Sequence, residues 1–139
     1  MKMTEGGGVE FTIPGEPVAK ARPRVTSQGT YTPAHVRKYE QSVHLLAANA
    51  RARLGITTPR KANAWRVTIH LYRYSRKAAD ADNMVKAILD GMNGTLYADD
   101  SQVEAGGWAT YWVDDPTAAC AKVYATPLPR PPRPPKERT

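Results

Sequence analysis

Five aspartates and one lysine gather in residues 78–102, AADADNMVKAILDGMNGTLYADDSQ, within a chain whose formal net charge is +7. Asp80 and Asp82 are separated by one residue, and in an extended segment their carboxylates would point the same way, about 6.7 Å apart. Two such carboxylates repel one another unless a cation lies between them. Because Mg²⁺ and Mn²⁺ favour carboxylate oxygens, the spacing predicts a metal site, with Asp99 or Asp100 as a third ligand.

Each aspartate also has a purely structural interpretation. Asp82 is a good N-cap residue for a helix, and Asp99 and Asp100 are typical of turns. Asp90 can pair with Lys86, which lies four residues before it in the same predicted helix. A capping aspartate can also bind a metal, so the two interpretations of Asp82 stay open together.

Lys86 favours the chemical interpretation. In a helix over residues 83–93, one stripe is apolar and consists of Val85, Ile88, Leu89 and Met92. The helical period of 100° per residue then places Asp82, Lys86 and Asp90 together on the polar side, with Asn93 beside them. An ammonium one turn from a metal-binding carboxylate can stabilise charge that builds up on phosphoryl oxygens.

Three other phosphate or metal motifs do not fit. A calcium EF-hand needs an acid or Asn at 84 and Gly at 85, where this chain has Met84 and Val85. An aspartyl-phosphate phosphatase would place its first aspartate after an apolar strand, whereas SRKAA precedes Asp80. The stretch EGGGVE lacks the GK(S/T) ending of a nucleotide-binding loop, so no nucleotide cofactor is expected.

Basic residues surround this acidic segment. Residues 17–79 carry a net charge of +12, residues 80–115 carry −7, and residues 116–139 carry +4. Such sorting predicts a polyanion-binding surface around a small acidic centre, although an unevenly charged solvated surface is the alternative.

The basic block contains an ordered row of cations. Lys20, Arg22 and Arg24 alternate in VAKARPRVT, so an extended segment would point all three one way, toward consecutive phosphates. A charged edge strand protected from aggregation is the alternative. Arg73, Arg76 and Lys77 come just before Asp80 and favour phosphate binding next to the acidic centre.

The elements expected to position these residues form one α+β domain. Alternation of apolar and polar residues predicts strands at 9–13 and 65–74, and two more around 102–113 and 118–125. One helix is expected at about 33–54, with Thr32 as its cap, and a second helix at 83–93. The order β-α-β-α-β-β predicts a small mixed sheet flanked by two helices, with a hairpin-like turn at DDPT between the last two strands.

We expect the folded domain to cover residues 1–126. Residues 127–139, PLPRPPRPPKERT, predict a basic proline-rich tail without regular structure, which either aids solubility or adds polyanion contacts. One cysteine, Cys120, and the lack of a long apolar run favour a cytoplasmic protein without a membrane segment.

Two stretches together resemble a known family. GEPVAKARPRV…YTPAHVRKYEQSV followed by DADNMVKAILDGMNG…YADDSQ is similar to the RusA-type Holliday junction resolvases, or crossover junction endodeoxyribonucleases, of bacteria, their phages and prophages. The resemblance covers roughly residues 13 to 105, and its most specific part is the pattern D-x-D-N-x-x-K-x-x-x-D…D-D-x-Q. The first ten residues and the proline-rich tail lie outside it.

The resemblance implies a homodimeric endonuclease that uses Mg²⁺, or Mn²⁺ in its place, to cut four-way DNA junctions by paired incisions in recombination and repair. The family's catalytic aspartates fall on Asp80, Asp82 and Asp100, and its essential lysine falls on Lys86. Asp100 is preferred to Asp99 because it stands directly before Ser101 and Gln102. Asn83, Asp90 and Asp99 are expected to have supporting roles.

Two other functions remain compatible with the same residues. One is a metal-dependent nuclease for forks or flaps in the same fold. The other is a non-catalytic DNA-binding module in which the aspartates only cap and turn. Cutting rates on a four-way junction, a fork and a plain duplex test the first alternative, and binding without cleavage in Mn²⁺ would favour the second. The most useful single experiment is cleavage of a synthetic four-way junction with and without Mg²⁺.

Overall fold

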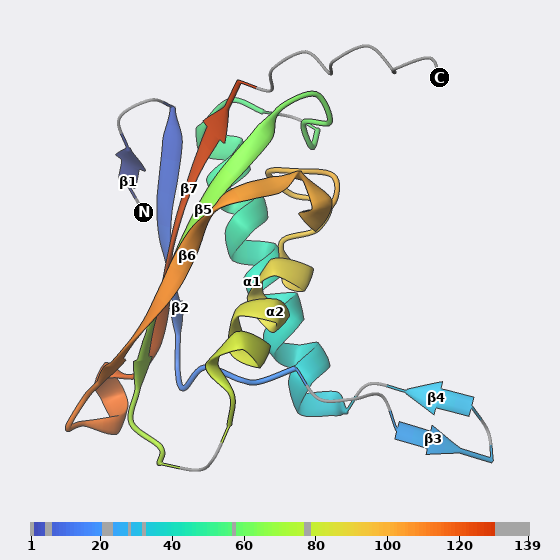
Figure 1. Cartoon of the computed structure of the whole chain (residues 1–139), viewed down its shortest axis with the longest axis vertical. Helices are drawn as coiled ribbons and strands as arrows, with labels where there is room; N and C mark the ends of the chain where they lie inside the picture. The colour runs from blue at the N-terminus through green and yellow to red at the C-terminus, as the bar shows by residue number, and fades with distance from the viewer. Residues whose placement is uncertain are drawn as a thin grey trace, which may run out of the picture.

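A computed structural model describes residues 2–4, 7–20, 24–27, 29–31, 33–56, 58–76 and 79–129; the side chains of 2–4, 24–26, 30 and 31 are not described. The chain in these ranges forms one mixed sheet, two helices and a separate small hairpin (Figure 1). No helix in these ranges is long and apolar enough to cross a membrane.

The sheet has five strands in the order β1-β2-β7-β5-β6. Their bounds are β1 Lys2–Thr4, β2 Gly8–Pro14, β5 Ala64–Arg73, β6 Val103–Trp112 and β7 Cys120–Leu128. Strands β5 and β6 are parallel, whereas β7 runs antiparallel to both β5 and β2. Strands β3 (Arg24–Thr26) and β4 (Gly29–Tyr31) pair with each other in a separate hairpin.

Helices α1 (Ala34–Arg53) and α2 (Ala81–Gly91) cover one face of this sheet (Figure 1). Alternate residues of the strands, such as Ile13, Ile69 and Val123, are buried against them. From the helices, Val43 of α1 and Ile88 of α2 enter the same core. The opposite face of the sheet therefore carries the outward-pointing residues of each strand.

The predicted fold class and element order are confirmed, with corrections to helix boundaries. Helix α2 begins at Ala81, two residues earlier than predicted, and Asp80 occupies the N-cap position. Asp82 therefore lies in the first helical turn, so its predicted capping role and its extended pairing with Asp80 are both wrong. At the start of α1 the N-cap is Pro33, not Thr32, which lies outside the described residues.

The buried side of α2 is also rotated from the prediction. Met84, Ala87, Ile88 and Gly91 are its buried residues, whereas Val85 and Leu89 are only partly buried. Val85 and Leu89 lie on the side of α2 that faces edge strand β6, where they line a pocket together with residues of that strand.

The expected hairpin between the last two strands is wrong, because β5 lies between β6 and β7. Strand β5, helix α2 and strand β6 form a β-α-β unit, which requires a parallel neighbour for β5 on one side. Strand β7 then pairs on the other side of β5 and closes the gap to β2. The DDPT turn becomes a crossover that contains a short 3₁₀ helix, η2 (Pro116–Ala118).

Strand β7 continues to Leu128, which is two residues into the segment expected to be tail. Residues 130–139, most of that segment, lie outside the described residues.

Candidate nuclease site

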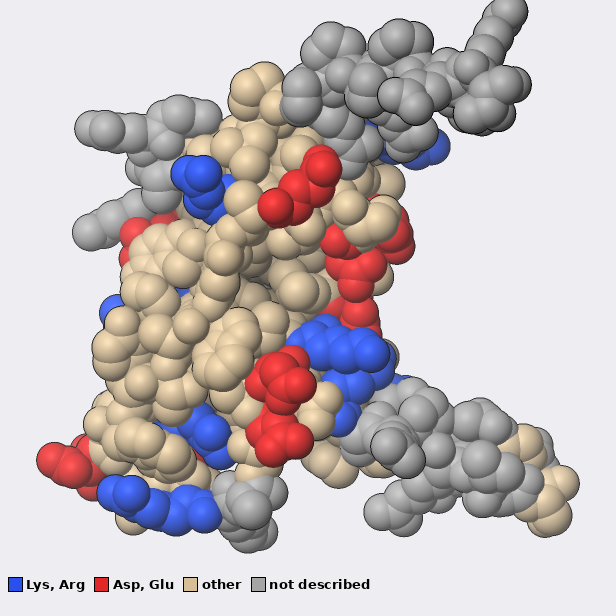
Figure 2. All heavy atoms as spheres, in the orientation of Figure 1, with Lys and Arg blue, Asp and Glu red and all other residues tan. Residues whose placement is uncertain are grey.

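One face of α2 carries the residues singled out by the sequence. Asp82 and Lys86 are exposed, and Asp90 is half-buried one turn further along. At the N-cap, the side chain of Asp80 makes no capping hydrogen bond, although its carbonyl accepts from Asn83 N at 3.1 Å. The Asp80 carboxylate is therefore not used to stabilise the helix. Figure 2 shows acidic and basic side chains side by side on the face of the molecule that includes α2.

The structure gives Asp99 and Asp100 different roles. Asp99 caps a short 3₁₀ helix, η1 (Asp100–Gln102), because its Oδ2 accepts a hydrogen bond from Ser101 N at 3.1 Å. Gln102 completes the capping box and also donates to the carbonyls of Arg60 and Asn63, at 2.8 and 2.9 Å. The hydrogen bond from Ser101 lowers the pKa of Asp99. Its carboxylate thus has a local structural partner.

Asp100 instead lies beside other acids. Partial burial raises its pKa, and the nearby carboxylates of Asp99 and Asp90 raise it further, whereas the Lys86 ammonium lowers it only in part. The interaction between the side chains of Asp100 and Asp90 is one of the causes of this raised pKa. Two carboxylates held so close together favour either a shared proton or a bound cation. This is the electrostatic condition expected of a metal ligand.

The loop between α2 and η1 holds Asp100 against the helix. Tyr97 is buried and its hydroxyl donates to the carbonyl of Leu89 at 2.9 Å. Thr95 and Leu96 are buried beside it, and Gly94 N donates to the carbonyl of Tyr97 at 3.0 Å. Because the chain folds back on α2, a residue ten positions after Asp90 lies next to it.

Lys20 is held between two acids. Its Nζ lies 2.9 Å from Glu40 Oε1 and 2.9 Å from Asp90 Oδ2, and these contacts raise its pKa although partial burial alone would lower it. Lys20 N also donates to the carbonyl of Asn83 at 2.9 Å. The amine predicted to contact DNA is therefore engaged within the protein.

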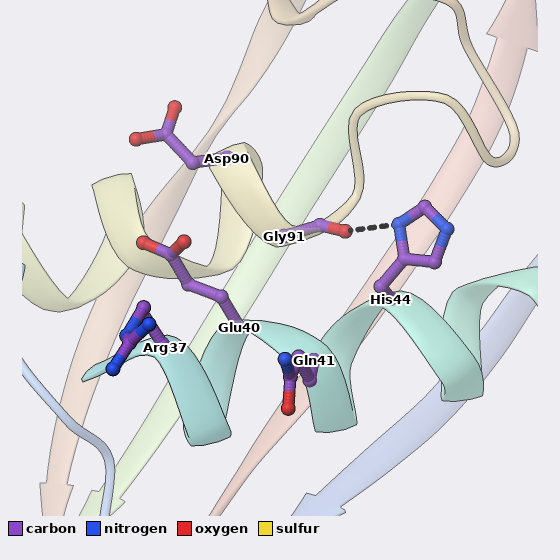
Figure 3. Close-up of a pocket in the computed structure, with 6 residues that line it drawn as sticks. All are labelled: Arg37, Glu40, Gln41, His44, Asp90 and Gly91. Atoms are coloured by element: carbon purple, nitrogen blue, oxygen red, sulfur yellow. Dashed lines mark hydrogen bonds between the residues drawn. The ribbon is translucent and has the colours of Figure 1, made fainter. Parts of the chain in front are cut away.

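Close packing of the two helices makes this arrangement possible. A Cβ atom on Gly91 would lie 2.9 Å from Val43 Cβ and 3.0 Å from the carbonyl oxygen of Glu40, so only glycine allows this approach. Figure 3 shows Glu40 and Asp90 on the facing sides of α1 and α2, with His44 Nδ1 3.0 Å from the carbonyl of Gly91. These residues line a shallow pocket of about 300 Å³.

The loop that leads from β5 to Asp80 is fixed at both ends. The carboxylate of Glu16 accepts hydrogen bonds from the backbone N–H groups of Tyr74 and Ser75, each at 3.1 Å. At the other end, Arg73 Nη2 donates to the carbonyl of Ala79 at 3.0 Å. Ala79 directly precedes Asp80. Glu16 and Arg73 together therefore determine where the chain enters α2.

The predicted DNA-binding cations differ in their surroundings. Arg73 is only 7% exposed, and its guanidinium lies 4.8 Å from the ring centre of Trp112. Arg76 is exposed, and its guanidinium lies 4.9 Å from the ring centre of the same Trp112. The backbone of Arg24 lies in β3, but its side chain is not described, and Arg22 and Lys77 lie outside the described residues.

The predicted metal ligands are not gathered in one place. In the described part of the chain, no three acidic, histidine or cysteine side chains are close enough together to hold a metal ion. Asp80 and Asp82 lie at the start of α2, whereas Asp100 has Asp90, near the end of α2, as its neighbour. The structure thus supplies one carboxylate pair and two further carboxylates on the same helix.

Two residues of this region were missed from the sequence. Glu40 is the one acid among residues 17–79, and Glu16 directly precedes that basic block. Their partners, Lys20 for Glu40 and the backbone of residues 74–75 for Glu16, are distant in the chain. The only available signal was that Glu40 is an isolated acid among 13 bases.

Comparison with known proteins agrees with the resemblance. The family model described as endodeoxyribonuclease RusA matches residues 14–120, a range that includes α1, α2 and all of the acids described above. The chain is also similar to the uncharacterized protein YqaN of Bacillus subtilis (strain 168). The two are 30% identical over 120 residues, which covers 68% of this chain and 81% of that relative.

Proposed function

The chain belongs to the RusA family of endodeoxyribonucleases, and on this premise we propose that it cuts four-way DNA junctions by paired phosphodiester hydrolysis in recombination and repair. The family match over residues 14–120 is the observation that carries the proposal. The surroundings of the acidic segment support a hydrolytic site, because one carboxylate is free of its capping role and two others are held together.

We further propose that Asp80, Asp82 and Asp100 hold a divalent cation, Mg²⁺ or in its place Mn²⁺. Asp100 is favoured over Asp99 because Asp99 is engaged as a cap, whereas Asp100 lies in a negative environment that a cation would relieve. A cation held there would supply a water of lowered pKa and neutralise charge on the scissile phosphate. Carboxylate oxygens are the donors that such hard cations prefer, so the donor atoms suit the ion. The three carboxylates do not surround one point in the described part of the chain, so binding would require them to move together.

The remaining polar residues of α2 have separate roles in this proposal. Lys86 is exposed one turn from Asp82 and close enough to Asp100 to lower its pKa, so its ammonium can stabilise charge on the phosphate. Asp90 has a supporting role, since it lies near Asp100 and is itself held by Lys20. The backbone carbonyl of Asn83 accepts the hydrogen bond from Lys20 N and so fixes the segment that carries Lys20.

For DNA contact, the exposed Arg76 is the strongest candidate among the predicted cations with described side chains. It directly precedes the segment that leads to Asp80, and Trp112 holds its guanidinium. Arg22, Arg24 and Lys77 remain proposed phosphate contacts. Lys20 and Arg73 are assigned instead to holding the site together, because their charged groups bind Glu40, Asp90 and the Ala79 carbonyl.

We also propose a homodimer that forms through β6. This strand lies at the edge of the sheet, and on its helix side Val85, Leu89, Val103 and Trp108 line an apolar pocket of about 300 Å³. Trp108 is 48% exposed. Pairing of two β6 edges about a two-fold axis would cover these side chains and give the two active sites needed for paired incisions.

The test is a cleavage assay on a synthetic four-way junction, compared with a fork and a linear duplex of the same sequence. Wild-type protein should cut the junction fastest and only with Mg²⁺ or Mn²⁺. Asp82→Asn should reduce the cleavage rate by about 100-fold or more while junction binding is retained. Glu10→Gln, which removes the same charge on β2 away from α2, serves as the control. Full cleavage by Asp82→Asn would refute the proposed site. Faster cutting of the fork than of the junction would show that the fork is the preferred substrate.

A further inference from the structure

The face of the sheet opposite the helices carries a group of aromatic rings. They come from three adjacent strands: Tyr124 from β7, His70 and Tyr72 from β5, and Tyr111 from β6. All four are at least partly exposed, and neither α1 nor α2 covers this face (Figure 1). We call these four residues the aromatic platform.

The rings of the platform are ordered against one another. Tyr72 and Tyr111 are stacked, with ring centres 5.1 Å apart and planes 19° from parallel. The ammonium of Lys122 lies 5.3 Å from the centre of the Tyr72 ring. Lys122, Tyr72 and Tyr111 therefore form a row across β7, β5 and β6. Tyr111, which is 43% exposed, is the outer end of this row.

His70 connects the two sides of the platform. Its ring centre lies 5.4 Å from that of Tyr111 and 5.1 Å from that of Tyr124. Glu10 of β2 pairs with Tyr124 in the sheet, and its charge contributes, after burial, to the raised pKa of Tyr124. Glu10 places a negative charge at the β2 side of the platform, whereas Lys122 places a positive charge beside Tyr72. An anion is therefore favoured toward the β5 and β6 side.

The composition of this face does not suit a protein interface. Thr12, Thr68 and Thr126 also point outward from it, and the largest apolar side chains near β6 instead gather on the helix side around Trp108. Rings with a polar edge, fixed on strands and left partly exposed, are the usual platform on which unpaired bases stack. Base pairs inside a duplex do not present their faces to such a surface.

We propose that the aromatic platform binds single-stranded DNA, with an unpaired base stacked on the exposed face of Tyr111 and Lys122 next to the backbone phosphates. This goes beyond the proposed cleavage of junctions, on which it depends only in that the partner is DNA. It would allow the protein to hold the unpaired bases exposed where strands exchange.

The test measures binding of a fluorescently labelled 12-nucleotide oligo-dT by anisotropy in EDTA, so that no cleavage can occur. Tyr111→Leu should weaken binding by about tenfold, as expected for the loss of one base–aromatic stack, and Tyr111→Phe should retain it. Lys122→Gln should make the affinity less dependent on salt, whereas Tyr111→Leu should leave that dependence unchanged. Thr12→Val, on the same face at β2, is the matched control.

Two results would overturn the inference. One is wild-type affinity for oligo-dT in Tyr111→Leu. The other is conversion of the protein to a different oligomeric state by this variant, measured by light scattering, which would assign the platform to contact with a second copy. Because the assay contains EDTA and measures binding alone, its result can be interpreted even if the cleavage proposal fails.

Discussion

At the scale of single residues, Asp100 is the acid whose charge the surrounding protein opposes most clearly. Burial and the carboxylates of Asp99 and Asp90 raise its pKa. Because the folded-state pKa is raised, the ionised carboxylate lowers stability above that pKa, and this penalty disappears as the pH falls through it. A bound cation would remove the same penalty at neutral pH.

Asp100→Asn should therefore raise the melting temperature of the protein in EDTA at pH 7.5, with a smaller difference at pH 4. It should also abolish cleavage, and added Mg²⁺ should stabilise it less than the wild type. Differential scanning fluorimetry with EDTA or Mg²⁺ measures both effects. Asp99→Ala is the control and should instead lose stability, because it removes the side chain that caps η1. A lower melting temperature for Asp100→Asn in EDTA would contradict the prediction.

Lys20 gives a second prediction at this scale, since its amine binds two carboxylates at 2.9 Å. Lys20→Gln should destabilise the protein by about 1–3 kcal/mol, because it leaves both acids without their cation. The salt dependence of duplex binding should not change, since Lys20 is not free to contact phosphates. Arg76→Gln, which removes an exposed cation, should show the reverse pattern. Urea unfolding and salt titrations of binding decide between the two roles.

At the scale of elements, the entry into α2 controls where Asp80 lies. Glu16 holds the start of the connecting loop through two backbone hydrogen bonds, and Arg73 holds its end at Ala79. Neither group lies in α2 itself. The contacts of Glu16 thereby connect the segment after β2 with the segment after β5, where the chain turns toward α2.

Glu16→Gln should slow cleavage by about tenfold at saturating junction concentration and leave the junction affinity near that of the wild type. The reason is that an amide offers one acceptor atom for two backbone donors, so the loop loses its fixed course. Single-turnover rates and equilibrium binding separate the two quantities. Glu10→Gln is the charge-matched control, and an equal loss of rate in that variant would show a general charge effect.

At the scale of the whole molecule, the apolar pocket at β6 and the edge strand itself predict the mode of assembly. Trp108→Glu should weaken the dimer by about 100-fold or more, because it places a charge where two copies meet. Leu45→Glu on α1 is the control, since Leu45 is 63% exposed and lies away from β6. Light scattering at micromolar concentration measures the change. A dimer that persists in Trp108→Glu would place the interface elsewhere.

The sequence by itself determined the parts that depend on local periodicity. The strand at residues 64–73, the long helix from residue 34 and the polar face of α2 follow from the spacing of apolar residues, and the acidic segment already predicted the family. The start of α2 was predicted two residues too late, because Asp80 and Asp82 are equally suitable cap residues by type. Backbone geometry decides which of them is the cap.

Only the tertiary structure decided which distant groups meet. The pairing of Lys20 with Glu40 and Asp90 depends on close contact of two helices at Gly91, and the position of β7 depends on the space that the β5-α2-β6 unit leaves. The aromatic platform likewise needs three strands in one order before its rings can stack. Such contacts have no signature in local spacing, because they arise when separate elements pack into one core.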